Sequence, residues 1–167
     1  MVQKLWDKYH LPDYKRQHST LVAAVALFFA KNLISKGFLI NTNLLEKAAL
    51  LHDIDKAIPT LPGEHHPDTG VRILHEEGLH DIANLVKTHS LPAILDARVA
   101  PNTWEEKLLY LADKMVKDTI LTVDKRIALW EAEGYPVPEY HAVKKLEQEI
   151  FSYLDLQPED VARRITL

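Results

Sequence analysis

Apolar residues recur along this chain at the three- and four-residue spacing of an α-helix. The first long stripe ends at Gly37, a residue typical of helix C-termini. It consists of Leu21, Val22, Val25, Phe29 and Leu33. The sequence has no convincing run of alternating apolar and polar residues, which would indicate a strand. The pattern therefore predicts an all-α fold.

Capping and breaking residues divide the rest of the chain into further helices. Asn43 is a candidate cap for a second helix, with Glu46 three residues later, and Pro59 stops that helix. Pro67 suits the first turn of a third helix, which Gly78 ends. The predicted inner face of the second helix contains Leu45, Ala48, Ala49 and His52, and that of the third contains Gly70, Ile73 and Leu74. A fourth helix follows, with Ile82, Leu85, Val86 and His89 on its inner face.

The second half of the chain continues the helical pattern. Thr103 and Glu106 form a capping box that opens a fifth helix, after a loop between Pro92 and Pro101. A sixth helix is expected from about 121 to 133. One face of the fifth helix contains Leu109, Ala112, Asp113 and Val116. A seventh helix carries Val143, Leu146, Ile150 and Leu154, and Pro158 starts a short last helix.

The length and composition indicate one globular helical bundle. The 167 residues are 47% hydrophobic, which is enough for a sizeable core and argues against disorder. The N-terminus has no signal-peptide pattern, and the longest apolar stretch, 21–30, is too short to span a bilayer. We therefore expect a single-domain cytoplasmic protein with no membrane partner.

Charge and cysteine content narrow the chemistry. The net charge of −4 offers no basic surface for nucleic acid, so no DNA partner is expected. A nucleotide substrate stays open, because a bound metal would supply positive charge locally. The absence of cysteine excludes disulfides, thiolate zinc sites and cysteine nucleophiles. Any metal must be held by nitrogen and oxygen ligands, which suit Fe, Mn, Co, Ni, Zn or Mg.

Several ionisable residues fall on predicted apolar faces. His52 and Asp53 end the second helix, and Asp113 falls among apolar residues of the fifth. Such groups are costly to bury unless they are paired or bind a metal. His18 or His89 alone would be read as a hydrogen-bonded core histidine. Together, these five residues favour a common metal site.

Neighbouring residues have competing interpretations. His66 stands beside Pro67, and His65 is its rival for a role there. Lys56 lies one turn after His52, where it would either contact a phosphate or be a surface lysine favoured by the helix dipole. His75 and His80 resemble a zinc-protease pair, but their five-residue spacing does not place them on one helix face.

Four ordered blocks resemble the HD superfamily of metal-dependent phosphohydrolases. The blocks span most of the chain, from about His18 to Lys117. They read Arg16-Gln17-His18-Ser19, Ala49-Leu50-Leu51-His52-Asp53-Ile54-Asp55-Lys56, His66-Pro67-Asp68-Thr69-Gly70 and Leu111-Ala112-Asp113-Lys114. The resemblance implies a single all-α HD domain over 1–167, with its motif core at about 16–118 and the helices of 119–167 packed on it.

The resemblance also implies a ligand set for two divalent metal ions. The first ion would be held by His18, His52, Asp53 and Asp113. Asp53 would bridge to a second ion that is held by His66 and His89. His66 is preferred to His65 because the family block reads His-Pro-x-x-Gly.

The implied activity is hydrolysis of a phosphoester or phosphoanhydride in a small, nucleotide-like substrate by a metal-activated hydroxide. Asp53 and Lys56 would be the catalytic residues. The expected substrate-binding residues are Lys56, Arg72, Arg98 and Arg126. Whether the substrate is a phosphomonoester or a phosphodiester stays open.

Three alternatives remain at this stage. A non-catalytic, regulatory metal- or nucleotide-binding module would have the same ligands, and a purely structural polar core is a further reading. Diadenosine tetraphosphate hydrolases share the six-ligand pattern, but they usually follow the fourth histidine with Thr and Gly, and the last Asp block with Arg. Here Ser90 follows His89, and Lys114 follows Asp113. The aromatic residues at 104, 130 and 135–140 are compatible with a homodimer interface or with the core.

Overall fold

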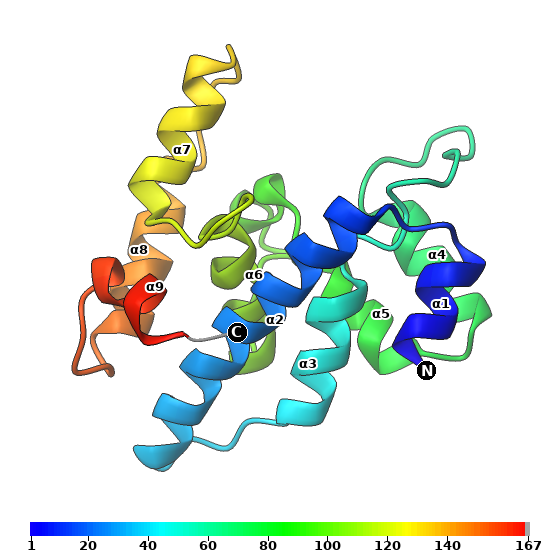
Figure 1. Ribbon diagram of the computed structural model, residues 1–167. Helices are drawn as coiled ribbons and strands as arrows, with labels where there is room; N and C mark the ends of the chain where they lie inside the picture. Colours follow the sequence, from blue (N-terminus) through cyan, green and yellow to red (C-terminus); the bar gives the residue numbers. More distant parts are fainter. Residues whose placement is uncertain (166–167) are drawn as a thin grey trace.

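The computed structural model of the protein describes residues 1–165, and their regular elements are all helices (Figure 1). This confirms the predicted all-α class. An isolated bridge between Val116 and Ile120 is the one β-type pairing within residues 1–165. The helices are α1 (Val2–Lys8), α2 (Asp13–Ser35), α3 (Thr42–Leu51), α4 (Asp68–Glu76), α5 (His80–Lys87), η1 (Leu91–Leu95), α6 (Trp104–Lys114), α7 (Val123–Ala132), α8 (Tyr140–Phe151), η2 (Pro158–Asp160) and α9 (Val161–Arg164).

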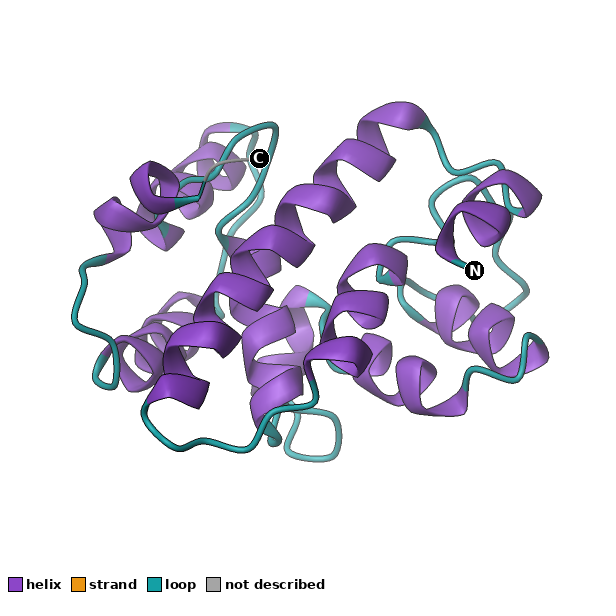
Figure 2. Ribbon diagram, turned by 60° about the horizontal axis from the view of Figure 1, so that its bottom comes forward, coloured by secondary structure: helices purple, strands orange, loops and turns teal. Residues whose placement is uncertain are grey.

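The longest helix, α2, runs through the middle of the molecule. Figure 1 shows α1, α4 and α5 on one side of it and α7, α8 and α9 on the other, and Figure 2 shows the same arrangement turned by 60°. α2 packs against both α3 and α6, and its predicted stripe is buried from Val22 to Leu33. By length and composition alone α2 could cross a membrane, a test that core helices of soluble proteins also pass. Here its stripe forms the centre of the core.

The structure differs from the sequence prediction at two helices. Helix α3 ends at Leu51, and turns rather than helix lead to Pro59. The cap of α3 is Asn41, not Asn43, because the Asn41 side chain accepts a hydrogen bond from the Leu44 amide at 3.0 Å. α1 was not predicted at all. It buries Leu5 and Trp6, and the Trp6 indole donates a hydrogen bond to the Leu50 carbonyl at 2.9 Å. Seven residues offer too few turns for a recognisable stripe.

The corner between α4 and α5 brings together the two histidines of the zinc-protease-like segment. Gly78 has a φ of +73°, a conformation that favours glycine, and it reverses the chain there. The Nδ1 atoms of His75 and His80 consequently lie 2.8 Å apart, although the residues do not share a helix face. Both rings are exposed and lie outside the cleft described below.

The C-terminal helices form a second packing group, in which α8 contacts both α6 and α7. Trp104, at the start of α6, packs edge-on against Phe38 and Tyr153, with ring centroids 4.8 and 5.7 Å away.

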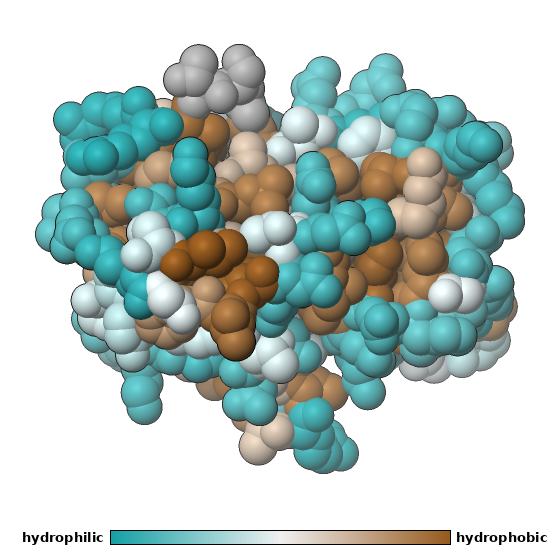
Figure 3. Space-filling view, turned by 90° about the horizontal axis from the view of Figure 1, so that it is seen from below, coloured by the Kyte–Doolittle hydropathy of each residue, from teal (hydrophilic) through white to brown (hydrophobic). Residues whose placement is uncertain are grey.

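Figure 3 shows an apolar patch on one face of the molecule, bordered by polar side chains. The homodimer stays a prediction.

The predicted capping box at the start of α6 is confirmed. The Glu106 amide donates to the Thr103 hydroxyl, and the Thr103 amide donates to the Glu106 carboxylate. Replacing Thr103 with alanine removes this acceptor, which typically costs about 1 kcal/mol. We expect the melting temperature to fall by about 2 to 4 °C in calorimetry. A Thr20→Ala change, on an exposed surface of α2, should shift it less. Equal shifts would contradict the capping role.

Candidate metal centre

Six ionisable side chains from separate segments converge beside the N-terminal half of α2. One comes from α2, two from the turn after α3, one from the loop before α4, one from the residues after α5 and one from the end of α6. They are His18, His52, Asp53, His66, His89 and Asp113. Their ligand atoms fall into groups in which all atoms lie within 4.8 Å of one another. The structure therefore brings together all six residues of the predicted ligand set.

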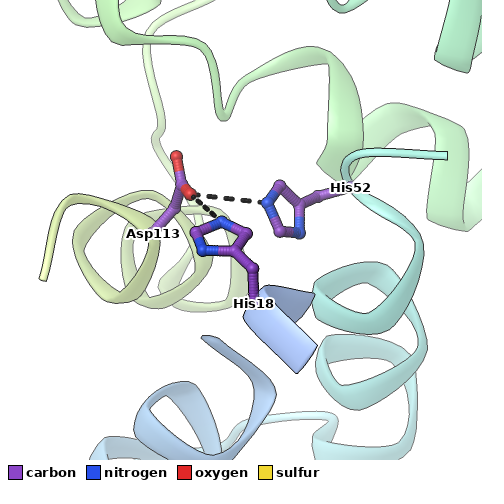
Figure 4. A group of neighbouring side chains, drawn as sticks. All are labelled: His18, His52 and Asp113. Atoms are coloured by element: carbon purple, nitrogen blue, oxygen red, sulfur yellow. Dashed lines mark hydrogen bonds and ion pairs between the residues drawn. The ribbon is translucent and has the colours of Figure 1, made fainter. Parts of the chain in front are cut away.

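Asp113 faces two histidines on one side of the cluster (Figure 4). Its Oδ1 atom lies 3.1 Å from the His18 Nε2 and 3.4 Å from the His52 Nε2. The two imidazole rings have centroids 5.3 Å apart. This triad has two nitrogens and one oxygen directed toward a common point.

Asp53 lies between this triad and a second pair of histidines. Its Oδ2 is 3.7 Å from the His52 Nε2, and its Oδ1 is 3.6 Å from the His66 Nε2. The Nε2 atoms of His66 and His89 are 3.0 Å apart. The two carboxylate oxygens of Asp53 thus face the two halves of the cluster, as a bridging ligand requires.

All four histidines have an oxygen acceptor for Nδ1. His18, His52 and His89 face the carbonyl oxygens of Lys117, Ala49 and Val86 at 3.2, 2.7 and 2.5 Å. His66 instead faces the carboxylate of Asp55, at 2.9 Å. Since these oxygens accept the Nδ1 proton, the network assigns the Nε2 lone pair of each ring to the cluster.

This arrangement leaves nitrogen lone pairs that the protein itself does not satisfy. The His52 Nε2 is buried and has no hydrogen-bond partner in the described chain. The His66 and His89 Nε2 atoms face each other with no proton between them once both Nδ1 atoms donate. Buried polar atoms are normally satisfied, and a cation would fit as the missing partner. The residues present fit a divalent metal with nitrogen and oxygen ligands.

The electrostatics favour the metal-binding protonation state at His89 and Asp53, but not at His52. Burial and the neighbouring His52 hold the pKa of His89 well below its usual range, so this ring is neutral at pH 7. Burial would raise the pKa of Asp53, but His52 and Lys56 outweigh it, and the pKa is lowered. Burial also opposes charge on His52, yet Asp53 and Asp113 raise its pKa overall.

Two lysines contact Asp53. The Lys56 ammonium is 3.5 Å from Oδ1, and the Lys15 ammonium is 2.8 Å from Oδ2. Sequence reasoning missed Lys15, although its position three residues before His18 places both on one face of α2. These cations flank the carboxylate that bridges the cluster.

A third lysine, Lys114, contacts two residues of the cluster. Lys114 is 3% exposed and donates hydrogen bonds to the His89 carbonyl, at 2.8 Å, and to the Asp113 carboxylate. Burial would raise the pKa of Asp113, but Lys114 and His18 hold it well below its usual range. Sequence reasoning quoted Lys114 only as part of a block and gave it no role.

The cluster opens into a central cleft of about 360 Å³. Among the predicted substrate-binding residues, Lys56 and Arg126 line this cleft, while Arg72 and Arg98 do not. Arg72 is bound to Glu64, and the side chain of Arg98 is 87% exposed and paired with Asp96. The other lining residues are Tyr14, Lys15, His18, Asp53, His66, His89, Ser90, Leu91, Asp113, Lys114, Lys117, Asp118 and Trp130.

Asp55 orients the His66 ring and provides a test of the second half of the cluster. Outer partners of this kind typically change metal affinity 10- to 100-fold when they are removed. We expect Asp55→Asn to weaken binding of one metal ion by about that factor, while the other ion stays bound. A calorimetric titration with Mn²⁺ measures the affinities of both ions. The control Asp96→Asn alters an exposed carboxylate and should change neither affinity. Unchanged binding in Asp55→Asn would contradict this role of Asp55.

Comparison with known proteins agrees with the geometry. The family model for the HD domain matches residues 16–118, which is more than half of the chain and contains all six clustered residues. No curated protein and no solved structure matches this chain significantly. HD domains bind divalent metals and are typically metal-dependent hydrolases. The chain belongs to the HD domain family.

Proposed function

We propose that this protein is a metal-dependent phosphohydrolase of small phosphorylated substrates, with a nucleotide as the expected class. The supporting observation is the convergence of four imidazoles and two carboxylates, of which all but the fully buried His52 line a cleft that also contains basic side chains. His18, His52, Asp53 and Asp113 would hold one ion, and Asp53, His66 and His89 a second. A cytoplasmic location belongs to the same proposal.

The metal ions, when bound, would lower the pKa of a water molecule and polarise the phosphoryl group. The chain's own residues set the geometry. Asp53 fixes the spacing of the two halves, because its oxygens face His52 and His66. Lys15 and Lys56 hold their ammonium groups at the edge of Asp53, where they would neutralise charge on phosphoryl oxygens.

The proposal is tested by turnover with added metal. Purified protein is mixed with p-nitrophenyl phosphate and with a panel of nucleotides, in the presence of Mn²⁺ or Co²⁺. Metal-dependent release of phosphate or of a nucleotide product supports the proposal. Binding of metal and nucleotide without turnover would favour the regulatory module instead. No bound ion and no thermal shift on adding metal would favour a structural polar core.

Lys56 provides a more specific prediction. A charge-assisted hydrogen bond to a phosphoryl oxygen is worth about 1.5 to 3 kcal/mol. We therefore expect Lys56→Ala to lower kcat/KM by about 10- to 100-fold, with metal content unchanged, because Lys56 is not a ligand. The control Lys31→Ala alters an exposed lysine of α2 and should leave kcat/KM unchanged. Full activity in Lys56→Ala would exclude the proposed contact.

A further inference from the structure

One basic residue of the cleft has no partner among the described residues. Lys15 and Lys56 pair with Asp53, Lys114 with Asp113, and Lys117 with Glu133 at 3.2 Å. Arg126, on α7, makes no side-chain hydrogen bond or ion pair within residues 1–165, and its Nε atom is buried without a partner. The residue is partly buried, and a buried N–H that has lost water without gaining an acceptor is unfavourable.

The orientation of Arg126 is fixed by an aromatic neighbour. Its guanidinium lies over the Trp130 ring, 4.1 Å from the centroid, and both residues line the cleft. Stacking on one face leaves the edge of the guanidinium available. That edge presents N–H donors in the planar fork that matches phosphate or carboxylate oxygens. Burial also lowers the pKa of Arg126, although Asp113, Glu133 and Asp118 act in the opposite direction.

The surroundings favour a phosphate over a carboxylate. Lys117 lines the same cleft, and its side chain is 39% exposed despite the pair with Glu133. A phosphate can engage both cations, since it carries more charge and more acceptor oxygens than a carboxylate. Figure 1 shows α7 on one side of the N-terminal half of α2, with the loop before α4 on the other. Arg126, on α7, and His66, in the loop before α4, both line the cleft.

We propose that Arg126, held by Trp130, is the subsite for a second phosphate of the substrate. The preferred substrate class is then a nucleoside di- or triphosphate, or a comparable phosphoanhydride, in preference to a simple phosphomonoester. This inference rests on the proposed function, because the first phosphate is taken to lie at the metal centre.

The kinetic test compares substrates with one and two phosphates. With Mn²⁺, kcat/KM is measured for adenosine 5′-monophosphate and adenosine 5′-diphosphate. For Arg126→Gln we expect a loss of about 10- to 100-fold with the diphosphate and less than about twofold with the monophosphate. Arg126→Lys, which keeps the charge without the fork, should lose less. The control Arg98→Gln, outside the cleft, should leave both values unchanged. Equal losses with both substrates, or none, would overturn the proposal.

A binding test separates this inference from the proposed function. Calorimetry measures the affinity of inorganic pyrophosphate for the metal-free protein, where Arg126 makes a larger share of the contacts. We expect at least a tenfold loss in Arg126→Gln and none in Arg98→Gln. If the wild-type protein turns over no phosphate ester, the proposed function fails, and pyrophosphate binding still decides on the subsite. Unchanged pyrophosphate affinity in Arg126→Gln would overturn the subsite whether or not the enzyme is active.

Discussion

Replacing Asp53 by asparagine is expected to remove both metal retention and hydrolytic activity. Asparagine keeps the shape of the side chain but loses the charge that faces His52 and His66. It also leaves the ammonium groups of Lys15 and Lys56 without their anionic partner. Metal-assisted charge stabilisation contributes several kcal/mol, so kcat/KM should fall by at least about 1000-fold.

The measurement pairs kcat/KM with elemental analysis of the same preparation. Asp96→Asn is the matched control, because it makes the same change on a partly exposed residue outside the cleft. It should retain full activity and full metal content. An Asp53→Asn protein that hydrolyses phosphoesters as fast as the wild type would show that the reaction site lies elsewhere.

The second large effect is expected on stability, from Lys114→Met. The Lys114 ammonium is almost completely buried and contacts Asp113 and the His89 carbonyl. Removing one member of a buried ion pair leaves the other uncompensated, which typically costs about 3 to 5 kcal/mol. For a domain of this size, the melting temperature of the metal-free protein should fall by roughly 6 to 20 °C. Added Mn²⁺ should restore part of this loss, because a cation again faces Asp113.

Thermal unfolding with and without metal tests this prediction. Lys107→Met is the control, since Lys107 also pairs with a carboxylate, that of Glu149, but in a more exposed position. Exposed pairs contribute up to about 1 kcal/mol, so its effect should be much smaller. Similar losses in the two variants, or a Lys114→Met loss that metal does not reduce, would contradict the account of Lys114.

Much of the fold could be predicted from the sequence because local signals agreed with packing. The α2 stripe and the Thr103 capping box each follow from residues close together in the chain. The start of α3 was placed two residues late, because Asn41 and Asn43 are equally good caps by sequence. Only the hydrogen bond to Leu44 distinguishes them.

Five of the six clustered residues could be proposed because ionisable groups on apolar helix faces require a partner, whereas His66 came only from the resemblance to the HD superfamily. Their supports could not. Lys15 and Asp55 act through contacts across different segments, with Asp53 and His66 respectively. Arg126 was one of three equivalent arginine candidates until the structure placed it in the cleft and the other two outside. Such contacts depend on the packing of distant helices, which periodicity does not encode.

The most direct test of the metal centre is the number of ions retained per chain. The protein is stripped with a chelator, loaded with Mn²⁺ or Co²⁺, separated from free metal and analysed for its elements. Two ions per chain in the wild type, and a loss of both in Asp53→Asn, are the predicted result. No retained ion in the wild type, or equal retention in both proteins, would contradict the assignment of this cluster as a metal centre.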